Sequence, residues 1–212
     1  MISETLVLAA SGCVFGLAGG FTPGPTTALV VAQALRFGPM EGIKVAIAPL
    51  LTDAPIIVLA ALLVGQLARF EAVLGGLTLL GAAFLLFLAV ESFRVRGFEI
   101  NEGTVGPRSI RKGFLVNLLN PHPYLFWIMV GAPTLLKAVG VGVFAAGLFL
   151  LGLYGCLVGA KVVVALLVGR SRSLLRSRGY VYVNRLLGLA LAVFASLFVR
   201  DGLRLLGVGV HQ

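Results

Sequence analysis

Charged residues are scarce in this sequence, and long stretches contain none at all. Asp, Glu, Lys and Arg together make up 12% of the 212 residues, whereas hydrophobic residues make up 59%. No polar stretch is left that is long enough to form a separate soluble domain. We therefore expect one transmembrane domain that covers residues 1–212.

The uncharged stretches predict six membrane spans. A helix needs about 20 apolar residues to cross a hydrocarbon core of roughly 30 Å, and five stretches meet that length. A sixth has a shorter uncharged middle and arginines near its ends, where they can reach the headgroups. The sequence thus predicts an all-α integral membrane protein with six transmembrane helices. The predicted spans are approximately residues 3–36, 43–65, 70–93, 113–136, 139–169 and 180–206.

Cysteine is also rare, which narrows the chemistry that the chain can perform. Cys13 and Cys156 both fall inside predicted spans, and neither belongs to a Cys-x-x-Cys pair. Neither a zinc site nor a disulfide framework is indicated, and we interpret both residues as buried, unreactive thiols. The sequence contains no Gly-x-x-x-x-Gly-Lys-Ser/Thr loop, so it has no P-loop ATPase of its own. We predict no metal, no cofactor and no enzymatic activity.

The few basic residues are unevenly distributed, and their distribution predicts topology. Most lie in the loops after the first, third and fifth spans, which the positive-inside rule assigns to the cytoplasm. Both termini are then outside a cell (inner or plasma) membrane, and the net charge of +9 indicates contact with anionic lipid, with no nucleic-acid partner. The basic loops contain Arg36, Lys44, Arg94, Arg96, Arg108, Arg111, Lys112, Arg170, Arg172, Arg176 and Arg178, and the other side contains Arg69, Lys137, Arg200 and Arg204.

Two proline motifs interrupt the first and the fourth predicted spans at corresponding places. They are Thr22-Pro23-Gly24-Pro25 and Asn120-Pro121-His122-Pro123. In lipid, the backbone groups freed by such breaks are tolerated only where they face protein or an aqueous cavity. A polar linker at about 94–112 separates three spans from three, so the second half enters the membrane from the opposite side. We predict an inverted-topology repeat, with repeat 1 at about 1–98 and repeat 2 at about 113–212.

Each motif has the composition of a helix that stops and starts again. Thr22 and Asn120 are good N-cap residues, and Pro23 and Pro121 suit the first helical position. The amides that follow each break then lack helical partners and offer a positive helix end to a carboxylate. The alternative is a pair of proline kinks that only shape the bundle. The predicted substrate-binding residues are Thr22, Pro23, Gly24, Pro25, Thr26, Asn117, Asn120, Pro121 and His122.

Three of the polar residues of the second half have alternative interpretations. Asn117 precedes Asn120 by three residues, so both amides share a helix face and can line a cavity together. His122 lies inside the second break, where it can titrate or remain neutral in a hydrogen bond. Tyr154 is a weaker candidate, which its depth in the fifth span alone suggests.

Asp53 and Lys161 are the ionisable residues predicted to lie deep within spans. An aspartate at this depth cannot reach a headgroup region, so it should face the bundle interior or a cavity. Asp53 is therefore a candidate proton carrier or a partner for a substrate ammonium group, and the alternative is a structural carboxylate held by Thr52. Lys161 can snorkel towards the cytoplasmic end, pair with Asp53 or bind a substrate carboxylate. We assign both residues to proton coupling.

Glycine, in contrast, is abundant, and many of the 28 glycines lie inside predicted spans. Small residues of this kind let transmembrane helices approach one another closely. We interpret Gly12, Gly16, Gly19 and Gly20 of the first span as packing residues.

The order of these features resembles the LysE/RhtB superfamily of amino-acid exporters. The first motif at 22–25, a basic loop and then Asp53 look like that family, and Gly113-Phe114-Leu115-Val116-Asn117-Leu118-Leu119-Asn120-Pro121 resembles its segment at the start of the fourth span. The resemblance covers essentially the whole chain. It implies a six-span inner-membrane protein that exports amino acids or related solutes, usually with the proton gradient, and it allows a homodimer. One departure is that the family's Asn-Pro is often followed by lysine, whereas His122 and Pro123 follow here.

We therefore predict a secondary active transporter that exports amino acids or similar small zwitterionic solutes by proton antiport. A small-solute channel with paired half-helices is one alternative, although such channels typically need two further re-entrant segments. A membrane thiol electron carrier of the CcdA kind is another. Such carriers place reactive cysteines beside their helix-breaking prolines, whereas Cys13 and Cys156 are far from both motifs in sequence.

Overall fold

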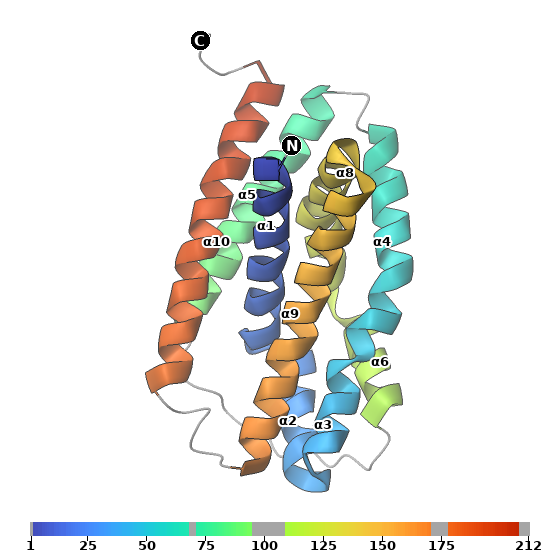
Figure 1. The fold of residues 1–212 in the computed structure, drawn as a ribbon, viewed down its shortest axis with the longest axis vertical. Helices are drawn as coiled ribbons and strands as arrows, with labels where there is room; N and C mark the ends of the chain where they lie inside the picture. The colour runs from blue at the N-terminus through green and yellow to red at the C-terminus, as the bar shows by residue number, and fades with distance from the viewer. Residues whose placement is uncertain (1, 68–70, 95–108, 171–177, 208–212) are drawn as a thin grey trace.

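The structure, a computed structural model, describes residues 2–67, 71–94, 109–170 and 178–207 (Figure 1). Every regular element in this part of the chain is a helix, and six helices are long and apolar enough to cross a membrane. The predicted all-α, six-span fold is therefore confirmed. Most of the predicted linker and the basic residues Arg69, Arg96, Arg108, Arg172 and Arg176 lie outside the described residues. The elements are α1 Ile2–Phe21, α2 Pro25–Phe37, α3 Pro39–Ala46, α4 Ala48–Leu67, α5 Glu71–Arg94, α6 Ser109–Leu119, α7 Pro121–Phe126, the π-helix η1 Trp127–Gly131, α8 Ala132–Val141, α9 Val143–Arg170 and α10 Arg178–Leu205.

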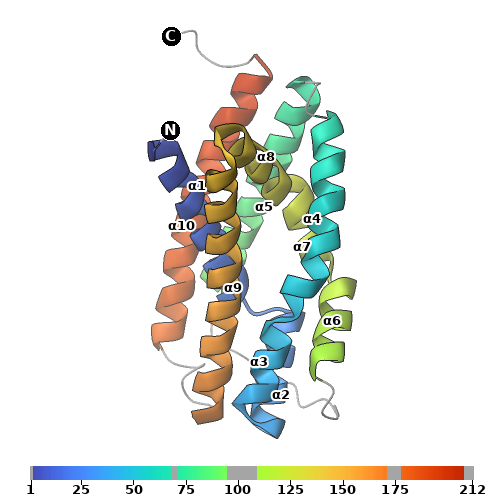
Figure 2. The ribbon, with the colours of Figure 1, turned by 45° about the vertical axis from the view of Figure 1, so that its right-hand side comes forward.

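The chain passes through the bundle six times, and Figure 2 shows these passes lying side by side. α1 and α2 descend in the view of Figure 1, α3 and α4 return, and α5 descends again. The second half runs up through α6 to α8, down through α9 and up through α10. The start of α1 and the end of α10 thus lie at one end of the bundle, which we call the terminal end.

The opposite end, which we call the basic end, holds most of the described basic residues of the predicted cytoplasmic loops. It contains the turn between α2 and α3, the end of α5, the start of α6, the end of α9 and the start of α10. A buried cluster ties three of these short helices together. Ser109 on α6 donates a hydrogen bond to Glu41 on α3 and lies 3.1 Å from Oε1 of Gln33 on α2. Lys44 pairs with the same Glu41 carboxylate.

The first broken span differs in detail from the prediction. The N-cap of α2 is Gly24, with extended backbone at φ −158° and ψ 178°, and Pro25 is the first helical residue. The prediction of Thr22 as N-cap is wrong. A helix that began at Pro23 would need Gly24 in a helical conformation, which the following Pro25 and the low helix propensity of glycine both disfavour. Thr22 instead follows Phe21, the last residue of α1, and its amide donates to the Ala18 carbonyl at 2.9 Å. The chain is unwound over Thr22–Gly24.

The second broken span restarts as predicted. Asn120 is the N-cap of α7, and its side chain accepts a hydrogen bond from the His122 amide at 3.1 Å. The π-helix that follows was not predicted. Pro133 cannot donate to the carbonyl four residues earlier, which disturbs the helical ladder at this point. The Trp127 ring covers Gly131, where a Cβ atom would lie 2.5 Å from Cε3 of that ring.

The second span is also interrupted, which the sequence analysis missed. α3 ends at Ala46 and α4 begins at Ala48, so Ile47 forms a joint between them. Pro49 explains the joint, because in a regular helix its ring would clash with the carbonyl of Val45. Its nitrogen also has no hydrogen to donate to that carbonyl. The amide of Leu50 accordingly bonds the Ile47 carbonyl, three residues back, at 3.0 Å.

Close packing between α1 and α9 confirms the predicted role of the glycines. A Cβ atom on Gly12 would lie 2.3 Å from the Phe149 carbonyl oxygen, and one on Gly16 would lie 2.2 Å from that of Leu153. The major contacts cross between the halves of the chain. α1 packs on α9, α4 packs on α6 and α8, and α5 packs on α10.

Candidate functional site

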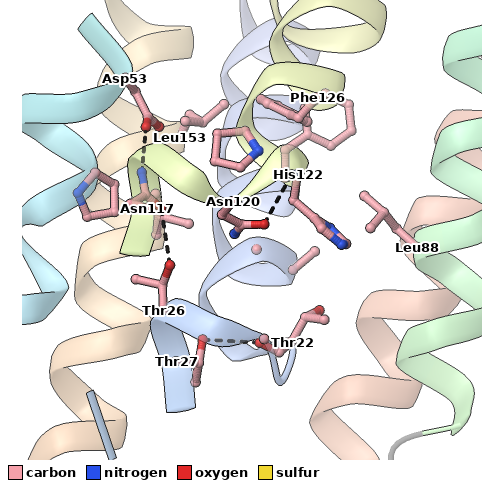
Figure 3. A pocket seen from close by; sticks show the side chains of 18 of the residues that line it. Thr22, Thr26, Thr27, Asp53, Leu88, Asn117, Asn120, His122, Phe126 and Leu153 are labelled. Atoms are coloured by element: carbon pink, nitrogen blue, oxygen red, sulfur yellow. Dashed lines mark hydrogen bonds between the residues drawn. The ribbon is translucent and has the colours of Figure 1, made fainter. Parts of the chain in front are cut away.

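A cavity of about 280 Å³, which we call the central cavity, lies where the first and fourth spans are broken (Figure 3). The first break contributes residues 22–27 to its wall, and the second contributes Asn117, Asn120 and His122. Asp53 from α4 and Lys161 from α9 also line it. The structure thus brings every predicted site residue to one cavity except Pro121, which is exposed at the first position of α7.

The two broken spans contact each other directly through Asn117. Oγ1 of Thr26, on α2, donates to Oδ1 of Asn117, on α6, at 3.1 Å. The Asn117 amide nitrogen donates to Oγ1 of Thr52 at 2.6 Å and to Oδ1 of Asp53 at 2.9 Å. Both hydrogens of the amide and one lone pair of its oxygen are therefore used. One buried side chain joins the first break, the second broken span and α4 (Figure 3).

Asp53 is held by donors on three elements. Besides Asn117, the hydroxyl of Tyr154 on α9 donates to its Oδ2 at 3.1 Å, and Oγ1 of Thr52 lies 3.2 Å from its Oδ1. The ring of Tyr154 is itself stacked on Trp127, with centroids 6.4 Å apart. An ionised carboxylate accepts all three bonds, whereas a protonated carboxyl must donate one, and only the two hydroxyls can turn to accept it. Protonation of Asp53 therefore rearranges this cluster.

Lys161 lies in the interior and does not snorkel. It is 4% exposed, and its Nζ donates to Oγ1 of Thr27 at 2.9 Å and to the Gly19 carbonyl at 3.2 Å. The described residues show no ion pair between Lys161 and Asp53, although both line the same cavity. An ammonium group has three hydrogens, so one donor remains for a ligand.

The two breaks differ in the backbone amides that they leave free. At the first break, Ala28 is the first residue whose amide has a helical acceptor, the Gly24 carbonyl at 2.8 Å. The amides of Thr26 and Thr27 have no acceptor in the described part of the chain. At the second break, Pro121 and Pro123 carry no amide hydrogen, and the His122 amide is bonded to Asn120. Residues 121–123 of the second break therefore offer no free amide hydrogen to a ligand.

The far side of the cavity includes residues that the sequence analysis missed. Its wall there is apolar, with Phe84, Leu85 and Leu88 of α5 and Leu191 of α10. Glu91 of α5 lines the cavity as well, and its Oε2 is buried without a hydrogen-bond partner. Its position close to the end of a span gave no sign of this role.

The two cysteines meet at the interface between α1 and α9. The Cys13 side chain lies beside that of Cys156, and both residues are partly exposed rather than buried. Their predicted burial is thus wrong, and neither lines the central cavity. In the described ranges, no group of three or more His, Cys, Asp or Glu side chains is placed to hold a metal ion.

Comparison with known proteins gives one family. The family described as LysE type translocator matches this chain over residues 17–202. Comparisons with the curated proteins and with the solved structures give no match. The matched range includes both breaks. It also includes every residue that lines the central cavity except Phe15 and Gly16, which precede residue 17.

Proposed function

Because the chain belongs to the LysE type translocator family, we propose that it exports a small zwitterionic solute, most simply an amino acid, in exchange for protons. Membership makes the protein a multi-pass membrane exporter of small solutes. The geometry of the central cavity supports the narrower proposal. A volume of about 280 Å³ is at the lower limit of pockets that bind drug-sized ligands, roughly 300–1,000 Å³, which suits a solute of amino-acid size.

The first break is the proposed site for the carboxylate of the solute. The free amides of Thr26 and Thr27 point out of a helix N-terminus, which attracts negative charge. Lys161 donates to the hydroxyl of Thr27 and keeps one donor, so a cation stands beside these amides. This combination of amides and ammonium is the observation that carries the proposal. The ammonium group of the solute then faces the unpartnered oxygen of Glu91.

Asp53 is the proposed proton carrier, and Asn117 links it to the solute. When Asp53 is ionised, it holds the Asn117 amide, which in turn accepts from Thr26 beside the carboxylate site. When Asp53 binds a proton, its bond to Asn117 is weakened, because a neutral carboxyl accepts a hydrogen bond less strongly than a carboxylate does. Loss of this link shifts Thr26 and disfavours the solute. Proton and solute therefore exclude each other, as antiport requires.

The orientation follows from the charge distribution. We propose that the basic end faces the cytoplasm of an inner or plasma membrane and that the terminal end faces outward. The halves at 1–98 and 113–212, related as an inverted repeat, then expose the central cavity to each side in turn. Many apolar side chains are exposed on the outer faces of the helices, which suits contact with lipid or with a second copy of the chain.

Counterflow in liposomes tests the proposal. The purified protein is reconstituted and assayed against a panel of amino acids, with and without a proton gradient. Asp53→Asn should retain exchange of solute for solute but lose accumulation driven by the gradient. Glu71→Gln, which changes an exposed carboxylate at the start of α5, is the control and should behave as the wild type. Undiminished gradient-driven transport by Asp53→Asn would reject the assigned role.

The contacting thiols favour a second candidate function, electron transfer across the membrane. Cys13 and Cys156 lie together on α1 and α9, as a dithiol carrier requires. They are not on the central cavity, however, and the proposed exporter makes no use of them. Transport that is unchanged in Cys13→Ala/Cys156→Ala would exclude the electron carrier.

A further inference from the structure

A second cavity, which we call the outer cavity, lies between the central cavity and the terminal end. Its volume is about 480 Å³. Residues from α1, α4, α5, α8 and α10 line it, so it lies within the bundle and not on a single outer face. Lys137, Asp201 and Arg204 mark its terminal end, where α8 and α10 finish.

The two cavities share Phe15 in their walls. This side chain is 5% exposed, and its ring meets the edges or faces of two other rings. Its centroid is 5.9 Å from that of Phe126 and 5.1 Å from that of Phe194, with interplanar angles of 75° and 62°. Phe126 lines the central cavity and Phe194 lines the outer one. A single layer of aromatic side chains, from α1, α7 and α10, therefore separates the two volumes.

The outer cavity is not a purely apolar void. Ser11, Thr78 and Thr134 line it from three different helices. The Ser11 and Thr78 hydroxyls donate to carbonyls of their own helices at 2.7 and 2.8 Å, and the Thr134 hydroxyl donates to the Val130 carbonyl of η1 at 2.7 Å. Their hydrogens are thus used while lone pairs remain, so the wall offers acceptors to water or to an ammonium group. At the terminal end, Nζ of Lys137 lies 3.2 Å from Oδ2 of Asp201, which adds charges of both signs.

We propose that the outer cavity is the outer chamber of the transport path and that Phe15, with Phe126 and Phe194, is the gate between the chambers. The acceptors and paired charges suit a small zwitterion with its water. The identity of the solute and its direction rest on the proposed function, whereas the gate itself is a property of the fold. Phe126 lies on α7, between the cap of the second break and the π-helix, so movement of this short helix withdraws one ring from Phe15.

Thiol labelling tests the gate without any transport. In a Cys13→Ala/Cys156→Ala background, single cysteines replace Thr134 in the outer cavity or Thr22 in the central cavity. A charged, membrane-impermeant methanethiosulfonate is added to each face in turn. A cysteine at Ile2, which is 82% exposed at the start of α1, identifies the terminal face.

Thr134→Cys should be labelled from the terminal face. Thr22→Cys should be labelled from that face at least tenfold faster once Phe15→Ala is added. Phe149→Ala removes an equally large buried ring that lines neither cavity and should leave the rate unchanged. Phe194→Ala should reproduce the effect if Phe15→Ala does not fold. No labelling of Thr134→Cys from the terminal face, or no acceleration at Thr22→Cys by either phenylalanine variant, would overturn the proposal.

The labelling result is independent of the solute and of the proton gradient. An accelerated rate together with absent counterflow would therefore refute the proposed function and support the gate. An unaltered rate together with coupled counterflow would refute the gate and support the proposed function.

Discussion

The two breaks have similar sequences but different structures. In the first, three residues are unwound, the N-cap is a glycine without a side-chain cap, and two amides remain free. In the second, a single residue is unwound, and the Asn120 side chain closes the only amide that the prolines leave. The first break leaves two donor amides for a ligand, whereas in the second the Asn120 cap uses the one amide hydrogen that residues 121–123 carry.

The difference follows from the residues between and before the prolines. Gly24 has no side chain with which to cap α2, and the amides of Thr26 and Thr27 lie beyond both prolines of the first motif. In the second motif, Asn120 stands directly before the first helical residue, where its oxygen reaches the His122 amide. Two similar motifs can therefore form helix breaks with different chemistry. We assign ligand binding to the first break and proton coupling to the surroundings of the second.

The largest expected effect comes from the packing that positions the first break. Gly16→Leu places a side chain against the Leu153 carbonyl of α9, only 2.2 Å from the new Cβ. Overpacking costs about 1–3 kcal/mol when neighbouring side chains can move aside. Here the neighbour is backbone, which cannot move aside, so we expect the free energy of unfolding to fall by that amount or more. Folded yield and thermal stability in detergent measure it. Gly159→Leu, on α9 but with nothing within 4 Å of its Cβ, should change neither quantity. A wild-type yield for Gly16→Leu would contradict the packing argument.

The next largest effect concerns the cation at the first break. Lys161→Met removes a charged donor, and hydrogen bonds to charged groups contribute about 1.5–3 kcal/mol. Solute affinity should therefore fall by roughly tenfold to 100-fold, at about 1.4 kcal/mol per tenfold change. The half-saturation concentration in counterflow measures it, with Arg111→Met, an exposed cation on α6 that lines neither cavity, as the charge-matched control. If both variants keep the wild-type value, the first break does not bind the carboxylate as proposed.

Asn117→Ala tests the connection between the breaks. It removes the acceptor of the buried Thr26 hydroxyl and one of the three donors to Asp53, and an unsatisfied buried group costs about 1–3 kcal/mol. We expect lower thermal stability and fewer protons moved per solute. Simultaneous measurement of proton and solute flux gives the second quantity. An unchanged ratio would show that the proton and the solute communicate by another route.

The smallest effects should come from the predicted cap residues. Asn120→Ala removes an N-cap, which costs about 1 kcal/mol of stability, and it should leave solute affinity within a factor of about three. Thr22→Ala should change even less, because Thr22 contributes its carbonyl oxygen, not its hydroxyl, to the bond with Thr27. A tenfold loss of affinity in Asn120→Ala would show that the second break also binds the solute.

Features encoded by local sequence were predictable. Long uncharged runs indicated the six spans, the proline motifs indicated the breaks, and the spacing of Gly12 and Gly16 indicated a packing face. The depth of Asp53 likewise indicated an interior position, whereas the longer side chain of Lys161 left snorkelling open as an alternative. Each of these inferences depends on neighbours within a few turns of helix.

Features that depend on competition or on distant neighbours were not predictable. Two prolines compete to begin α2, and only the fold shows that Pro25 does so. Tyr154 is 101 residues from Asp53, and no periodicity indicates that its hydroxyl reaches the carboxylate. Contact between Cys13 and Cys156 depends on the register of α1 against α9, which sequence spacing does not specify.

The joint at Ile47 has a mechanical consequence. Together with the interruptions at 22–24 and at Asn120, it divides three of the six spans near mid-depth, whereas α5, α9 and α10 cross as continuous posts. The short helices below the joints, α2, α3 and α6, are tied to one another by Ser109, Gln33 and Glu41. These three helices can tilt together as a rigid body against α5, α9 and α10. Backbone rotation is then confined to the three interruptions, and no helix unwinds. Substitutions of Ser109, Gln33 or Glu41, which lie away from the central cavity, should consequently change the turnover rate of transport and leave the affinity for the solute unchanged.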